Sequence, residues 1–271
     1  MASDSKTPAM SLFNNPTLSD IKIKQTYNDK TREYHAHKSV LCLHSTYFLK
    51  AFTGNYREAS DAEMEVHDDD PESFELALKF IYSAKYQSIR KEINGDKDKN
   101  RIDVLCSIIK LYIVADKYHI TSLLKESVLH LQVVWASKAL TKIAPRMVIK
   151  PMVEEYYMQC GAPGSRMGKA ITSSILKYYR RGTGSQLFGK MLVEHPMFSA
   201  DIALTSSRKH LLSFKVMVCR LASCHFRVAV EDEDAVVQTL ECPYCQTKGL
   251  KPGLDPDPDS DSGAEDKNES D

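Results

Sequence analysis

The sequence has no excess of either charge, because 36 Lys and Arg residues balance 36 Asp and Glu residues among its 271 residues. Such a balance provides no electrostatic footprint for a nucleic acid or an anionic membrane, so we expect neither as a partner. No apolar run reaches the roughly 20 residues that a bilayer span requires. The polar opening, MASDSKTPAM, lacks the apolar core of a secretory signal. We therefore expect a cytoplasmic or nuclear protein.

The chain is also poor in features that would make it an enzyme. The segment GSRMGK at residues 164–169 resembles a phosphate-binding loop only superficially. It has three residues between its glycines where four are required, and Ala170 stands where Ser or Thr should bind magnesium. No other arrangement of nucleophile, base or paired carboxylates is visible, so the sequence predicts a protein without catalytic activity.

Seven cysteines and no secretory signal argue against a disulfide framework. Four of them are nevertheless grouped as two close pairs, Cys219 with Cys224 and Cys242 with Cys245. Two such pairs can complete the tetrahedral shell of one Zn²⁺, which leaves no open position and makes the metal structural. Four residues rather than two separate the first pair, so His225 is an alternative ligand. The segment is too short to form a core of its own, which also favours a metal.

The most informative stretch that is present is AHKSVLCLHSTYFLKAF, residues 36–52. Its apolar positions fit a single helix that is apolar around most of its circumference. A helix of this kind is buried in its own domain or packs against a second copy of the chain. We interpret it as the centre of an assembly domain.

Other elements are predicted around this stretch. Residues 20–24 and 31–36 alternate as two strands joined by a turn, and residues 62–66 form a short strand. Asp70 and Pro71 mark the start of a helix. A charged, solvated loop is expected at 90–101. Further helices are expected at 104–118, 120–131, 136–160 with interruptions at Pro145 and Pro151, 170–180, 187–194 and 198–205.

Four landmarks in this order resemble the BTB/POZ family: Leu18 to Ile23, the helix at 36–52, Asp70 to Phe74 with Phe80 to Ser83, and Leu111 to Tyr118. The resemblance implies an α+β fold, in which a small mixed sheet is flanked by a helical cluster. The chain also resembles short fungal BTB proteins with Cys-rich tails. We expect a disordered lead-in (1–17), a BTB/POZ domain (18–131), a helical extension (132–213), a zinc-ribbon-like β segment (214–250) and an acidic disordered tail (251–271).

The resemblance implies a homodimer, with interface residues at Asp20, Lys38, Val40, Leu41, Tyr47 and Phe48. Asp20 and Lys38 are expected to form an ion pair that supports the fold. Tyr56 and Glu58 resemble the motif that BTB adaptors present to a cullin, and a loop aromatic with a solvated Glu explains the same residues equally well. The predicted function is protein binding, as a substrate adaptor of a cullin-RING ubiquitin ligase. The alternative is a nuclear transcription or chromatin regulator that dimerises through its BTB domain.

Overall fold

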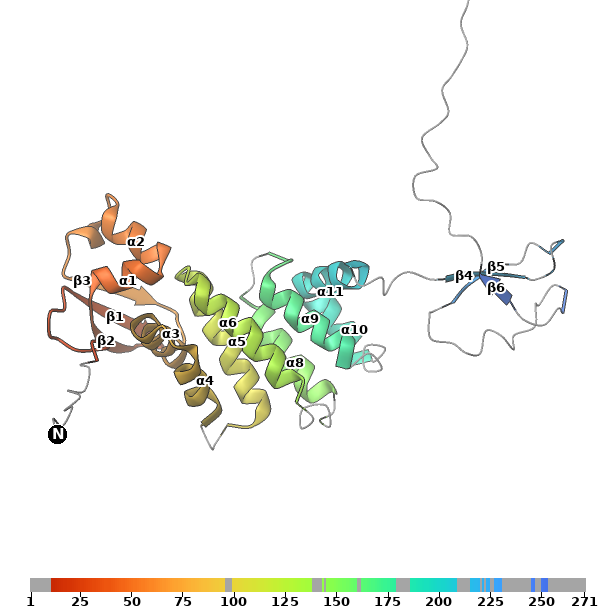
Figure 1. The fold of residues 1–271 in the computed structure, drawn as a ribbon, viewed down its shortest axis with the longest axis horizontal. Coiled ribbons are helices and arrows are strands. Elements are labelled where there is room, and N and C mark those ends of the chain that lie inside the picture. Colours follow the sequence, from red (N-terminus) through yellow and green to blue (C-terminus); the bar gives the residue numbers. More distant parts are fainter. Residues whose placement is uncertain are drawn as a thin grey trace, which may run out of the picture. The chain divides into compact units, whose positions relative to one another are not determined.

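A computed structural model describes most of the first 208 residues and short parts of the remainder. The described residues are 11–95, 99–137, 143, 145–159, 162–178, 186–208, 215–219, 221, 223–224, 227–230, 245–246 and 250–252. The chain divides into two compact units, Met1–Thr205 and Ser206–Asp271. In the first unit a small sheet lies at one end, and helices make up the rest (Figure 1).

The sheet of the first unit has the strand order β2-β1-β3. β1 (Ile21–Tyr27) and β2 (Lys30–Ala36) form an antiparallel hairpin, while β3 (Glu63–His67) pairs parallel to β1. Asn28 and Asp29 connect the hairpin with positive φ angles of 47° and 60°, as a two-residue turn of this twist requires. Alternate residues of β1 are buried, which confirms the strands expected from the sequence.

The stretch at 36–52 forms two helices where we expected one. α1 (Lys38–His44) ends before Ser45, whose backbone is extended, and α2 (Thr46–Thr53) begins after it. The Ser45 hydroxyl accepts a hydrogen bond from the Phe48 N–H at 3.1 Å and donates one to the Tyr118 carbonyl at 2.6 Å. The side chain thus caps α2 and anchors the break to the core, a role that apolar periodicity does not reveal.

Four helices follow the sheet: α3 (Pro71–Ser83), α4 (Tyr86–Gly95), α5 (Arg101–Lys117) and α6 (Thr121–Trp135). Asp70 caps α3 by accepting from the Ser73 N–H, and Pro71 is its first residue, as predicted. The expectation of a solvated loop from residue 90 was wrong for its first part. Ile89 and Ile93 are 1 and 2% exposed, so α4 buries one apolar face although its other side is charged.

The helical extension consists of α8 (Pro145–Tyr157), α9 (Arg166–Tyr178), α10 (Gln186–Glu194) and α11 (Pro196–Arg208). It belongs to the same compact unit as the sheet, and α8 packs on α5 while α9 packs on α6. Contrary to expectation, α8 continues through Pro151. Val148, Met152 and Val153 are fully buried on both sides of this residue, and their packing offsets the roughly 3 kcal/mol that an interior proline costs.

The predicted disordered lead-in is wrong for residues 11–17. The Phe13 ring packs edge-on against Tyr82 at 6.0 Å, and the Asn14 side chain accepts a hydrogen bond from the His35 N–H. The Thr17 carbonyl contacts His37 Nε2 at 2.9 Å. These contacts join the segment to the sheet before the first strand begins, and polar composition alone does not show them.

The second unit contains a three-stranded antiparallel sheet with the order β5-β4-β6. Its strands are β4 (Lys215–Cys219), β5 (Arg227–Val230) and β6 (Leu250–Pro252). A strand at the position of β5 was expected. The returning part of the predicted zinc ribbon, at 231–244, lies outside the described residues.

Candidate interaction surfaces

The segment that follows α2 carries an aromatic residue and a carboxylate two positions apart, Tyr56 and Glu58. Gly54 ends α2, and a Cβ at this position would lie 2.7 Å from the Lys50 carbonyl and 2.8 Å from the Tyr56 ring. Glycine therefore permits the close turn that directs Tyr56 outward, with 63% of its surface exposed. Glu58 lies half-exposed on the short 3₁₀ helix Arg57–Ala59.

Lys38 holds this segment in place. Its ammonium donates hydrogen bonds to the carbonyls of Glu58, Ala59 and Asp61 at 3.0 to 3.1 Å, and it lies over the Phe52 ring at 5.3 Å. Asp20 does not pair with this ammonium, since its Oδ1 accepts the backbone N–H of Lys38 at 2.7 Å instead. The predicted ion pair was therefore wrong: Asp20 satisfies the start of α1, and Lys38 organises the loop that carries Tyr56 and Glu58.

The residues assigned to a dimer interface from the sequence fall into two groups. Leu41 and Phe48 are 0 and 1% exposed, so they belong to the core and have no surface to offer a second copy. Val40 and Tyr47 are half-buried, and the Tyr47 ring packs on Tyr118 at 5.1 Å. Burial raises the pKa of the Tyr47 phenol.

The sequence analysis missed two apolar residues on the surface of the same helices. Leu43 and Leu49 are 78 and 43% exposed. The break at Ser45 rotates α2 relative to α1, so the outward positions differ from those of one continuous helix. A serine within an apolar stretch was the signal that could have indicated this.

The predicted zinc ligands are only partly described. Cys219 is the last residue of β4, and Cys224 and Cys245 are half-buried. Cys242 and the alternative ligand His225 lie outside the described residues. Among the residues that the structure describes, no three His, Cys, Asp or Glu side chains gather as a metal site. The zinc site therefore remains a prediction.

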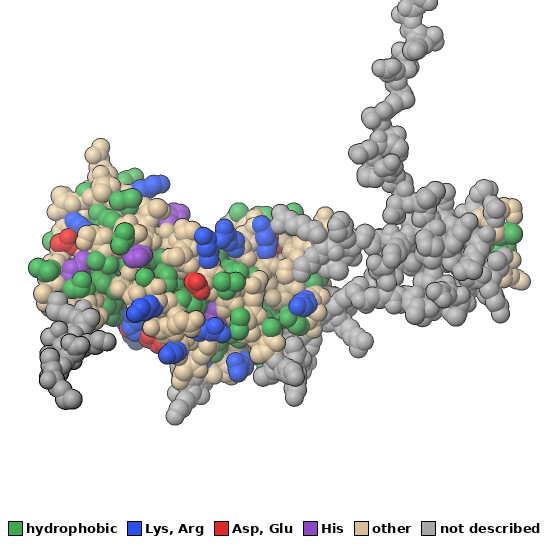
Figure 2. Space-filling view, viewed as in Figure 1, with side chains coloured by type: hydrophobic (Ala, Val, Ile, Leu, Met, Phe, Trp, Pro, Cys, Tyr) green, Lys and Arg blue, Asp and Glu red, His purple; other side chains and the backbone are tan. Residues whose placement is uncertain are grey.

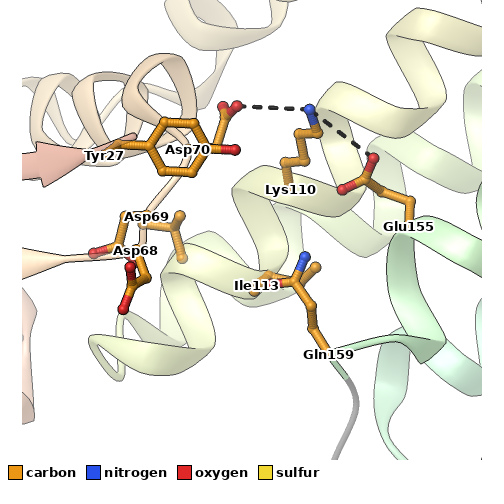
Figure 3. A pocket seen from close by; sticks show the side chains of 9 residues that line it. Tyr27, Asp68, Asp69, Asp70, Lys110, Ile113, Glu155 and Gln159 are labelled. Atoms are coloured by element: carbon orange, nitrogen blue, oxygen red, sulfur yellow. Dashed lines mark ion pairs between the residues drawn. The ribbon is translucent and has the colours of Figure 1, made fainter. Parts of the chain in front are cut away.

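A further hollow of about 400 Å³ lies between the loop at 68–70 and α8, with α5 as its floor (Figure 3). Lys110 of α5 points toward Asp70 on one side and Glu155 of α8 on the other, at 3.6 and 3.9 Å (Figure 3). Burial raises the pKa of the Glu155 carboxyl, and Lys110 only partly opposes this. The sequence shows the run of aspartates at 68–70, but only the packing of α8 on α5 brings Glu155 to it.

Asp69 fixes the wall of this hollow. It is 5% exposed, and its carboxylate accepts hydrogen bonds from Lys117 Nζ at 3.0 Å and from the Tyr118 hydroxyl at 2.5 Å. Its carbonyl accepts from Gln25 Nε2 at 2.7 Å. The hollow therefore has a well-connected wall, because strand β1, the loop at 68–70 and the end of α5 are joined through one buried residue, Asp69.

In the described part of the chain, exposed apolar and aromatic side chains occur together with open hollows that are rich in carboxylates. None of the described helices has the length and apolarity that a bilayer crossing needs. Exposed apolar and aromatic side chains beside charged hollows are typical of surfaces that bind other proteins.

Comparison with known proteins also indicates a protein-binding module. Residues 10–133 match the BTB/POZ domain family, so the chain contains a BTB/POZ domain. BTB domains are interaction modules rather than enzymes. The match begins at residue 10, in agreement with the packing of residues 11–17 onto the sheet.

Three curated relatives are similar to parts of this chain. Armadillo BTB Arabidopsis protein 1 of Arabidopsis thaliana is 25% identical over 179 residues, 66% of this chain and 20% of that protein. An ARM repeat protein interacting with ABF2, also of Arabidopsis thaliana, is 36% identical over 31% of this chain and 11% of its own. Kelch-like ECH-associated protein 1A of Danio rerio is 32% identical over 25% of this chain and 11% of its own.

The chain thus spans a fifth or less of the length of these relatives. The first similarity covers more residues than the BTB/POZ domain alone. The relatives come from a plant and a fish, so the predicted likeness to short fungal proteins remains a prediction.

Proposed function

We propose that this protein is an adaptor that self-associates through its BTB domain and binds a cullin scaffold through Tyr56 and Glu58. It would act in the cytoplasm or the nucleus. The observation that carries the proposal is the exposed Tyr56 ring two residues before Glu58, at the start of a loop that Lys38 binds by three hydrogen bonds. A pre-organised aromatic anchor is the type of residue that dominates binding energy at protein interfaces.

The chemistry of the loop supports this use. Tyr56 can bury its ring in an apolar recess of the partner and still hydrogen-bond through its hydroxyl. Glu58 can accept hydrogen bonds from backbone or side-chain donors beside it. The same region resembles the contact motif of cullin-binding BTB adaptors, and the match to the BTB/POZ family includes it.

Calorimetric titration of the full chain with a cullin N-terminal domain tests the proposal. Tyr56→Ala and Glu58→Ala should each weaken binding by about tenfold or more, since a factor of ten corresponds to about 1.4 kcal/mol. Arg57→Ala is the matched control, because Arg57 is an exposed neighbour on the same 3₁₀ helix. Absence of binding by the folded protein, or equal losses in all three variants, would show that the loop is not a cullin contact.

A further inference from the structure

A row of three adjoining hollows runs along α5. Three hollows of about 350, 400 and 500 Å³ follow one another between α3 and the loop at 68–70 on one side and α8 with the segment at 162–165 on the other. The first two share Asp70, Lys110 and Glu155 in their linings, and the second and third share Ile113 and Gln159. We call this feature the α5 groove. From Asp103 to Asp116 its floor is about 20 Å long at 1.5 Å per residue.

The α5 groove is strongly acidic although the whole chain is neutral. The charged residues of the central hollow are Lys110 and four carboxylates, Asp68, Asp69, Asp70 and Glu155 (Figure 3). The outer hollows add three carboxylates and one lysine: Glu72, Asp103, Asp116 and Lys99. Seven acidic and two basic side chains therefore line the groove, and since Lys117 outside the lining pairs with Asp69, a local excess of four negative charges remains. By contrast, the face drawn in Figure 2 presents many more Lys and Arg than acidic side chains.

The central carboxylates are incompletely neutralised within the chain. Lys110 is shared between Asp70 and Glu155 at 3.6 and 3.9 Å, longer than the 2.7–2.9 Å of a strong charge-assisted hydrogen bond. The Glu155 side chain is only 22% exposed, so water solvates it poorly. A second cation placed between these carboxylates would relieve that cost.

The floor of the α5 groove also accepts apolar groups. Ile113 is accessible in the central hollow and Pro163 in the next one, while Val114, Tyr112 and Tyr156 lie beneath them and are 3 to 5% exposed. The Tyr112 and Tyr156 rings are 6.2 Å apart and meet edge to face. An occupant with alternating basic and apolar side chains would fit both the acidic walls and this floor.

We propose that the α5 groove binds an extended segment of a partner protein that carries Arg or Lys next to apolar residues. A strand of about six residues spans the floor at 3.3 Å per residue. A nucleic acid does not fit, because the walls would repel its phosphates. The groove is built from other elements than the Tyr56 loop, so this proposal does not depend on a cullin contact.

Selection of a random phage-displayed heptapeptide library on the immobilised full chain tests the proposal. The enriched peptides should contain Arg or Lys beside apolar residues. Synthetic copies should bind about tenfold or more weakly to Glu155→Lys, while Glu155→Gln should have a smaller effect and Glu154→Lys less than about a twofold effect. Glu154 is the matched control because it lies on the same helix, 45% exposed and paired with Lys150, outside the groove lining.

Three results would overturn the proposal. They are a selection without enrichment of basic residues, peptides that bind Glu155→Lys as well as the native chain, and equal losses for Glu154→Lys and Glu155→Lys. The last result would mean unspecific charge attraction. Thermal unfolding of each variant shows that it is folded, and Tyr56→Ala should leave peptide binding unchanged.

Discussion

At the scale of single residues, Lys38 connects the first helix of the domain to the loop that we propose as a partner contact. Its ammonium is bound by three carbonyls and rests on the Phe52 ring. The loop that carries Tyr56 and Glu58 is therefore positioned by a lysine whose ammonium binds backbone carbonyls. From the sequence, Lys38 was expected to pair with Asp20, because a carboxylate is an obvious partner for a lysine. Its ammonium binds backbone carbonyls instead, and since every residue has a carbonyl, the sequence does not indicate which of them it binds.

We predict that Lys38→Met loosens this loop. Amide hydrogen exchange at residues 57–61 should accelerate by about tenfold or more, because three hydrogen bonds to one cation are lost. Lys38→Arg should restore only part of the protection, since a planar guanidinium cannot replace a compact ammonium among three converging carbonyls.

Lys50→Met is the control, because Lys50 is an exposed lysine on α2 whose carbonyl, rather than its side chain, contacts Gly54. It should leave the exchange rates unchanged. If Lys38→Met also leaves them unchanged, the loop is held by other contacts and Lys38 does not position it.

At the scale of elements, α9 and α11 meet through a glycine and a buried carboxylate. Asp201 is 0% exposed and accepts hydrogen bonds from the Tyr157 hydroxyl at 2.9 Å and from the Gly164 N–H at 2.6 Å. A Cβ on Gly168 would overlap Asp201 Oδ2. Only glycine lets the two helices approach at this point. From the sequence alone, Gly168 is simply a residue with low helix propensity, and its packing role cannot be predicted.

We predict that Gly168→Ala and Gly189→Ala have opposite effects, although both glycines lie inside helices. Alanine normally stabilises a helix by about 1 kcal/mol relative to glycine. Gly189 in α10 has open space around it, so its replacement should raise the melting temperature. Gly168→Ala should lower it by displacing Asp201 from its donors, at a net cost of about 1–3 kcal/mol.

Differential scanning calorimetry of the two variants and the native chain checks this pair. A stabilised Gly168→Ala protein would show that α9 and α11 can separate without loss, and that the hydrogen bonds of Asp201 contribute little.

At the scale of the whole molecule, we predict self-association through α1. Leu43 is 78% exposed on this helix, between the half-buried Val40 and Tyr47. Leu43→Glu should shift the sedimentation coefficient toward that of a monomer, because a charge replaces an apolar contact. Val193→Glu is the control, since Val193 is equally exposed on α10. Identical sedimentation of both variants and the native chain would place the interface elsewhere or exclude a dimer.

The second unit provides the other prediction at this scale. Purified full chain should contain one zinc per molecule by elemental analysis, and Cys242→Ser or Cys245→Ser should lose it. Chelation should abolish the amide protection of β4, β5 and β6, because a segment this small needs the metal for its core. The unfolding transition of residues 1–205, which form their own unit, should not change. A zinc-free protein with fully protected strands would contradict the prediction.

The sequence alone determined the class of the protein and the position of most elements. Alternation in β1, the Asp70-Pro71 start of α3 and the apolar spacing of α5 and α6 are local signals, and the structure confirms each of them. Such patterns can be read directly because burial of one face imposes a fixed period on the chain.

Only the tertiary structure decided where these elements break, which side chains are left outside and which distant groups meet. The break at Ser45 is anchored to the Tyr118 carbonyl, Leu43 is left exposed while Leu41 on the same helix is buried, and α8 passes through Pro151 because its neighbours are buried. Glu155 joins the aspartates at 68–70 only when α8 packs on α5. These features arise from contacts between residues far apart in the chain, and such contacts leave no period or spacing in the sequence.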